Sequence, residues 1–87
     1  MKKETMSIQL ANGLEARPIA VMVQIASQFD SKIYLEAEGK RVNAKSIMGM
    51  MSLGMDAGEN VTIEADGEDE NAAVAKLADF LSGKEVK

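Results

Sequence analysis

The sequence contains no cysteine, no histidine and no tryptophan. Without cysteine the chain can form neither disulfides nor thiolate metal sites. Without histidine it lacks the commonest general base, and also the commonest nitrogen acceptor for a phosphoryl group. These absences weaken an enzymatic interpretation before any motif is considered.

Aromatic residues make up only 3% of the 87 residues, so a core must be built from aliphatic side chains and methionine. A hydrophobic content of 46% with 28% charged residues is ordinary for a soluble chain, and the length suits a single domain over residues 1–87. The net charge of −4 argues against a nucleic-acid backbone as direct ligand. Any role linked to DNA would have to pass through another protein.

No apolar run approaches the length of a membrane span, and the Met1-Lys2-Lys3 start lacks the apolar stretch of a signal peptide. We therefore expect a reducing, cytoplasmic setting and no membrane partner.

Alternating apolar and polar residues predict strands around residues 6–10, 33–37 and 61–65, with Thr62 and Glu64 turned outward. Glu38-Gly39 is typical of a tight turn, after which residues 40–43 return as a short strand and complete a hairpin.

Three segments have helical spacing: residues 16–28, 47–53 and 69–82. Pro18 is tolerated only in a first turn, which places the first helix start near Glu15 or Ala16. Ser46 is expected to cap the second helix. Gly54 and Gly83 are expected to end the second and third helices, and residues 84–87 to fray.

The resulting order is β-α-β-β-α-β-α. Strands with one apolar face need a cover, and helices with one apolar stripe supply it. The sequence therefore predicts an α+β domain in which helices pack on one face of a largely antiparallel sheet.

No segment carries a strong catalytic or metal-binding pattern. The acidic run at residues 68–70 is better explained as a charged helix start than as a metal site. Glu15 near Arg17 is better explained as a local ion pair at a helix end than as a catalytic pair. Gly49 and Gly54 match no phosphate-binding loop. We predict no catalytic residue, no metal and no cofactor.

The segment from Asn43 to Gly54 places a hydroxyl, Ser46, before a run of soft apolar side chains. Four of the seven methionines lie between Met48 and Met55. A helix this short cannot bury all of them. The pattern alone favours a capped helix that covers a small core, and the alternative is an exposed, adaptable surface that binds a partner.

Two short stretches carry a family resemblance. Gly-Leu-Glu-Ala-Arg-Pro at residues 13–18 and Lys-Ser-Ile-Met-Gly at residues 45–49 resemble the two signature stretches of HPr, the small phosphocarrier of the bacterial phosphoenolpyruvate sugar phosphotransferase system. The resemblance covers nearly the whole chain. It implies an open-faced β-sandwich, with a four-stranded antiparallel sheet covered on one face by three helices.

The first stretch departs from the family at Glu15. In HPr that position is the histidine that carries the phosphoryl group from Enzyme I to sugar permeases. The resemblance therefore implies that Glu15 and Arg17 form a degenerate phosphocarrier site without carrier activity. A relative that lacks this histidine but keeps the serine resembles Crh, the catabolite-repression branch of the family. Crh has glutamine at this position, so Glu15 is a second departure.

The second stretch is intact. The resemblance implies that HPr kinase/phosphorylase phosphorylates Ser46 and that the phosphoserine form is a corepressor of the catabolite control transcription factor. It also implies that Arg17 is a cation near Ser46 and that the first two helices form one partner-binding face. That face would comprise Ala16, Arg17, Ala20, Lys45, Ile47, Met48 and Met51.

Two alternatives remain open. In one, the chain is a natural or engineered phosphocarrier whose Glu15, or another group, still accepts from Enzyme I and passes the group to sugar permeases. In the other, it is an HPr-like module that binds another enzyme without any phosphorylation. The missing histidine argues against the first, and the intact stretch at residues 45–49 argues against the second.

Overall fold

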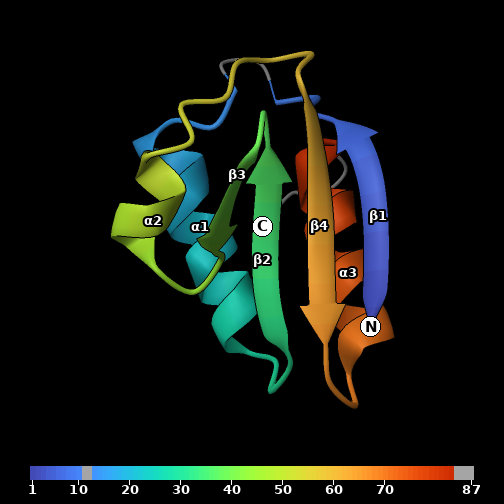
Figure 1. Cartoon of the computed structure of the whole chain (residues 1–87). Coiled ribbons are helices and arrows are strands. Elements are labelled where there is room, and N and C mark those ends of the chain that lie inside the picture. The colour runs from blue at the N-terminus through green and yellow to red at the C-terminus, as the bar shows by residue number, and fades with distance from the viewer. Residues whose placement is uncertain (11–12, 84–87) are drawn as a thin grey trace.

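The computed structural model describes residues 1–10 and 13–83. The expectation for residues 84–87 lies outside this range. The element order β-α-β-β-α-β-α is confirmed (Figure 1). The elements are β1 (Lys2–Ser7), α1 (Ala16–Ser27), β2 (Lys32–Ala37), β3 (Lys40–Asn43), α2 (Ile47–Met51), β4 (Asn60–Asp66) and α3 (Glu70–Leu81).

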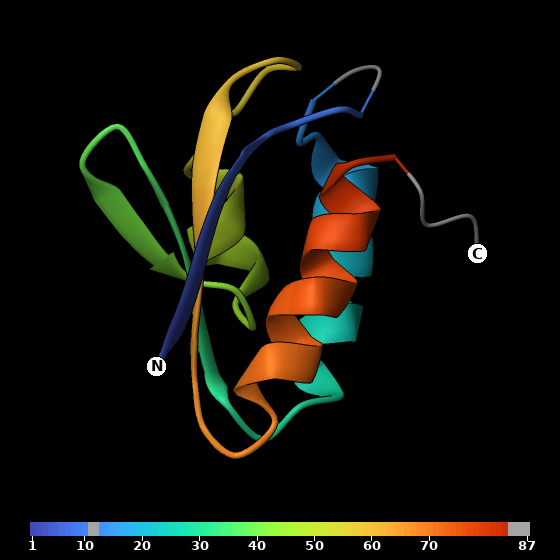
Figure 2. The same ribbon diagram turned by 90° about the vertical axis from the view of Figure 1, so that its right-hand side faces the viewer.

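The four strands form one sheet in the order β1-β4-β2-β3, and each neighbouring pair is antiparallel. All three helices lie on the same side of this sheet, and the opposite side is left open (Figure 2). The predicted α+β open-faced sandwich is therefore confirmed.

The core lies between the sheet and α1 and α3. On the inner face, Ile33 pairs with Ala65 and Leu35 pairs with Ile63, and all four are buried. The helices bury one face each against these strands, as amphipathic helices do. The buried helix residues are Ile19, Met22, Ile25, Ala26, Met50, Ala73, Val74, Leu77 and Leu81.

The first strand differs from its prediction. Alternation indicated residues 6–10, whereas β1 ends at Ser7 and begins at Lys2. Ile8 is still buried, but its amide N–H donates to the carbonyl of Glu59 in the loop before β4. The next amide, that of Gln9, donates to Leu81 at the end of α3. The first residues of β1 show no apolar alternation in the sequence, because β1 is an edge strand and its first side chains are exposed.

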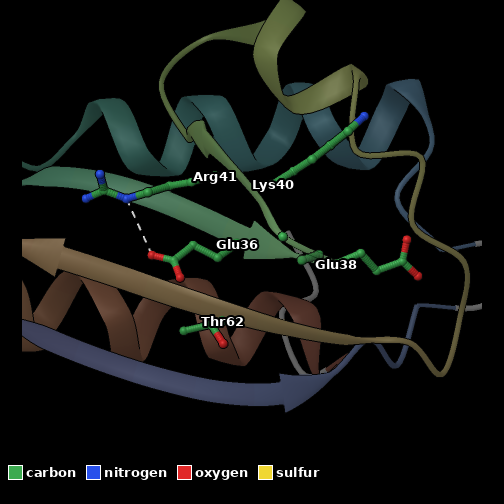
Figure 3. A pocket seen from close by; sticks show the side chains of 7 residues that line it. Glu36, Glu38, Lys40, Arg41 and Thr62 are labelled. Atoms are coloured by element: carbon green, nitrogen blue, oxygen red, sulfur yellow. Dashed lines mark ion pairs between the residues drawn. The ribbon is translucent and has the colours of Figure 1, made fainter.

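The open face of the sheet carries a charged cluster. Glu64 points to this face as predicted, but only 3% of it is exposed, and its carboxylate contacts the side chains of Arg41 and Lys3. Arg41 forms an ion pair with Glu36 at 3.4 Å (Figure 3). The same guanidinium donates to Glu64 at 2.9 Å and stacks on the Tyr34 ring. A hydrogen bond shared with Glu64, together with burial, raises the pKa of Glu36, while the same bond and Arg41 lower the pKa of Glu64.

Candidate functional site

Ser46 is the N-cap of α2, as the sequence predicts. Its backbone is extended, and its Oγ accepts a hydrogen bond from the Gly49 amide at 3.2 Å. The Ser46 carbonyl accepts from the Met50 amide at 3.0 Å and so closes the first turn. Ser46 is half-buried and stands at the N-terminal end of a short helix.

The residues before Ser46 hold it in place through contacts that the sequence analysis did not identify. Asn43 accepts the Lys45 amide on its side-chain Oδ1 at 2.8 Å and the Ser46 amide on its backbone carbonyl at 3.0 Å. Such a turn, in which an Asn side chain binds a backbone N–H two residues on, is a recognisable local pattern. In addition, the Lys45 ammonium donates to the Phe29 carbonyl at 2.7 Å. The position before Ser46 is therefore fixed at both its backbone and its side chain.

Next to Ser46 lie three exposed apolar side chains, Ile47, Met48 and Met51, here called the methionine patch. Their exposed fractions are 49%, 85% and 53%. Met50, on the opposite side of the same helix, is completely buried and packs α2 onto the core. Of the two interpretations open from sequence, both hold in part: one side of α2 covers the core, and the other presents apolar surface to solvent.

The first motif is tied to the loop that follows α2. Gly13 has φ +72°, and a Cβ there would lie 2.6 Å from the Met55 carbonyl oxygen, so only glycine fits. The next residue, Leu14, is buried, and its amide donates to the same carbonyl at 2.9 Å. The first motif segment is thus in direct contact with Met55, which lies after α2 and outside the second motif segment.

Glu15 is the exposed N-cap residue of α1, so the predicted helix start is confirmed. The expected ion pair with Arg17 is not formed. Among the described residues, the Glu15 carboxylate makes neither a capping hydrogen bond nor an ion pair with Arg17. Both side chains point into water, where an ion pair contributes little and long side chains lose entropy on pairing.

The helices α1 and α2 run in opposite directions (Figure 1). Leu14, before α1, bonds Met55 after α2, whereas Lys45, before α2, bonds Phe29 after α1. Ser46 therefore lies toward the C-terminal end of α1, a helix of 12 residues and about 18 Å in length. Arg17 is in the first turn, at the other end. The order of the two helices does not place Arg17 beside Ser46, and the expectation that Arg17 is a cation near Ser46 stays a prediction.

The remaining residues of the expected partner-binding face lie on the first turns of α1. Ala16 is exposed and Ala20 is half-buried. With Arg17 they lie at the end of the helix pair where α1 begins and α2 finishes, whereas Lys45 lies at the opposite end. The surface hollow of about 320 Å³ lined by Glu36, Glu38, Lys40, Arg41 and Thr62 lies elsewhere, around the β2–β3 turn (Figure 3).

The site offers a hydroxyl that can accept a phosphoryl group and, beside it, an exposed apolar surface. Within residues 1–10 and 13–83, no cluster of three or more acidic side chains is arranged to hold a metal ion. Nor does this part of the chain contain a helix long and apolar enough to cross a membrane.

The acidic run at residues 68–70 leads into α3, with Asp69 as the N-cap residue. The Asp69 carboxylate accepts hydrogen bonds from the Asp30 and Ser31 amides and from the Ser31 hydroxyl.

The fold and the two motif segments define a small open-faced sandwich protein that presents a serine at the start of a short surface helix. Residues 2–83 match the PTS-HPr family, described as the PTS HPr component phosphorylation site. The chain belongs to the HPr family.

The relatives of this chain include two proteins that are named HPr-like protein Crh. The chain is 49% identical over 81 residues to the HPr-like protein Crh of Bacillus subtilis, covering 93% of this chain and 95% of the relative. It is 44% identical to Crh of Halalkalibacterium halodurans, and the match covers 93% of this chain and 96% of that relative. Among solved structures, an HPr of Thermoanaerobacter tengcongensis is 47% identical, with a TM-score of 0.90 over 99% of this chain and 100% of that one.

Proposed function

We propose that this chain is a cytoplasmic, regulatory HPr-like protein of carbon catabolite repression. HPr kinase/phosphorylase phosphorylates Ser46, and the phosphorylated form acts as corepressor of the catabolite control transcription factor. The observation that carries this proposal is the combination of a capping hydroxyl beside an exposed apolar patch with the complete absence of histidine. The similarity to two Crh proteins supports the same role.

A phosphoryl group on Ser46 adds a charge of about −2 at the start of α2. The surroundings are compatible with this charge, because Ser46 Oγ already accepts a backbone N–H and Lys45 is the adjacent cation. The fold need not change, since the core side of α2 is held by Met50. A partner would read the new charge together with the methionine patch beside it.

The methionine patch suits a protein partner. Unbranched methionine side chains adapt to different surfaces, and apolar anchors at the centre of an interface supply most of the binding free energy. Arg17, at the other end of the α1/α2 surface, would then contact the partner rather than the phosphate. Ala16 and Ala20, beside Arg17, add small side chains that would let a partner approach α1 closely.

Loss of carrier activity is the second part of the proposal. Imidazole holds a phosphoryl group on nitrogen and releases it readily, whereas position 15 offers only a carboxylate. The opposing function, a carrier that accepts from Enzyme I and passes the group to sugar permeases, would need an acyl phosphate on Glu15. Glu15 is exposed and geometrically accessible, so this alternative is decided by experiment.

Incubation with HPr kinase/phosphorylase and ATP tests the assignment of Ser46. Intact mass should rise by one phosphate, and the Ser46→Ala variant should show no increase. Ser52→Ala is the matched control, because Ser52 is an exposed hydroxyl at the other end of the same helix. Phosphate that persists in Ser46→Ala but disappears in Ser52→Ala would refute the assignment.

A further inference from the structure

Five of the seven methionines fall into two groups with very different access to solvent. Met48 and Met51 are 85% and 53% exposed. Met22 and Met50 are completely buried, and Met55 is 4% exposed. The two exposed side chains lie on one side of α2, three residues apart, which makes them neighbours on the helix surface.

Exposure decides how fast a thioether reacts with a peroxide. A hydroperoxide transfers one oxygen atom to the methionine sulfur, which is oxidised by two electrons to the sulfoxide, while hydrogen peroxide itself is reduced to water. Met48 and Met51 can be attacked in the folded protein. A buried methionine reacts only when the surrounding structure opens.

We propose that the methionine patch is an oxidation-sensitive site: peroxide converts Met48 and Met51 to sulfoxides and so changes the patch from apolar to polar while the fold persists. A sulfoxide is a polar hydrogen-bond acceptor, and it carries its own chemistry of repair, since reductases convert it back to the thioether. The modification is therefore reversible in a cell that contains such reductases.

The domain keeps its fold because the contacts that hold α2 do not use these two side chains. Met50 supplies the buried contact of the helix, and Ser46 Oγ supplies the cap. The hydrogen bond from the Lys45 ammonium to the Phe29 carbonyl fixes the segment that leads into the helix. Oxidation at the solvent side of α2 leaves each of these interactions in place.

The consequence for regulation rests on the proposed function. If the phosphorylated form docks through the methionine patch, two sulfoxides would be buried in an interface core without matched donors, which weakens binding. The site would then combine two signals on one short helix: phosphorylation of Ser46 creates the docking form, and oxidation of Met48 and Met51 cancels it.

The chemical part is tested on the full-length chain without any partner. The protein is treated with limiting hydrogen peroxide and mapped by peptide mass spectrometry over time. Met48 and Met51 should be oxidised at least about tenfold faster than Met22, Met50 and Met55. Met1, which is 67% exposed and lies outside the patch, is the internal control for exposed methionine. Equal rates for the exposed and buried groups would overturn the proposal.

Hydrophobic-interaction chromatography then measures the change in surface polarity. The oxidised protein should elute earlier than the untreated protein, and treatment with methionine sulfoxide reductase should restore the original position. The Met48→Leu/Met51→Leu double variant still contains Met1, so it reports what oxidation outside the patch contributes. A shift of the same size in this variant, or loss of the cooperative urea transition in the oxidised wild type, would refute a patch-specific effect.

The binding arm separates this inference from the proposed function. Phosphorylated wild type is titrated against the catabolite control transcription factor before and after oxidation, and affinity should fall about tenfold. The double variant, compared with its own untreated form, should show no such fall. If untreated phosphorylated protein fails to bind, the proposed function is wrong and the patch-specific mass and chromatography results still decide the oxidation site. If untreated protein binds and oxidation leaves affinity unchanged, the regulatory consequence is wrong.

Discussion

The Lys45 ammonium donates a hydrogen bond of 2.7 Å to the Phe29 carbonyl and thereby joins the residue before Ser46 to the end of α1. A second bond, from the Leu14 amide to the Met55 carbonyl, joins the start of α1 to the loop after α2. The two bonds lie at opposite ends of the helix pair. Together they fix the position of α2, which has only one fully buried side chain of its own.

Lys45→Met should lower the free energy of unfolding by about 1 kcal/mol, because a charge-assisted hydrogen bond to a part-buried carbonyl is lost while the apolar stem is kept. Lys40→Met is the matched control. Its ammonium also donates to a backbone carbonyl, that of Ser52, but at 3.2 Å and fully at the surface. Urea unfolding followed by circular dichroism measures both. A loss in Lys40→Met as large as that in Lys45→Met would contradict the structural role of Lys45.

Met48→Asp should weaken binding of the Ser46-phosphorylated form to the catabolite control transcription factor by about tenfold or more, since an unpaired charge would be buried in an interface core. Met48 is 85% exposed in the free protein, so the substitution should leave the unfolding free energy nearly unchanged. Isothermal titration calorimetry compares it with Ala75→Asp, which adds the same charge at an exposed position of α3. Equal affinity of Met48→Asp and wild type would mean that another face docks.

Much of this architecture follows from local sequence signals. The alternation in β2 and β4, the turn at Glu38-Gly39 and the capping serine each act over a few residues, and the structure confirms all of them. Both turn residues have positive φ, 52° and 81°, as the two-residue turn of a hairpin requires. The role of Ser46 in phosphorylation stays a prediction.

The parts that sequence did not predict depend on contacts between distant residues. The start of β1 is polar and is specified by pairing with β4, as in Lys2 with Ala65. The burial of Glu64 depends on Arg41 from a different strand. The separation of Arg17 from Ser46 follows from the opposite directions of α1 and α2, and no spacing along the chain encodes that direction.

Asp69→Asn should destabilise the domain at neutral pH, because the Asp69 carboxylate accepts the Asp30 and Ser31 amides and the Ser31 hydroxyl. The bond from the Ser31 hydroxyl, followed by the bond from the Asp30 amide, lowers the pKa of Asp69 in the folded state. A lowered folded-state pKa means that the ionised group contributes stability above the unfolded value of about 3.9, and that this contribution is lost as pH falls through the lower folded value.

The difference in unfolding free energy between wild type and Asp69→Asn should therefore be constant from pH 8 to about pH 5 and shrink below about pH 4. Urea titrations at several pH values measure it. Glu68→Gln is the control, since Glu68 is an exposed neighbouring acid in the same turn. A difference that grows with acidification would contradict the assigned direction.

The last prediction concerns position 15. Glu15→His should restore phosphoryl acceptance from phosphoenolpyruvate and Enzyme I, which the wild type should lack. The scaffold around the position is present: Gly13 makes the close approach to Met55, Leu14 is bonded to it, and residue 15 caps α1. Free backbone N–H groups in the first turn of a helix favour an anion there. The substitution thus supplies the nucleophile that the site lacks.

Glu15→Gln separates the imidazole from a simple loss of charge, because it removes the carboxylate without adding an acceptor nitrogen and should remain inert toward Enzyme I. It should also change Ser46 phosphorylation by less than about twofold, because Glu15 caps the start of α1 whereas Ser46 lies toward its other end. Salt largely screens the interaction of exposed charges that are more than about 10 Å apart. Labelled phosphoenolpyruvate with gel analysis at alkaline pH compares the variants with wild type. Label on the wild type would establish that Glu15 or another group still carries phosphate. A Glu15→His variant that unfolds at the wild-type urea concentration yet stays unlabelled would show that the Enzyme I docking surface has also been lost, since the acceptor and its backbone support would then both be in place.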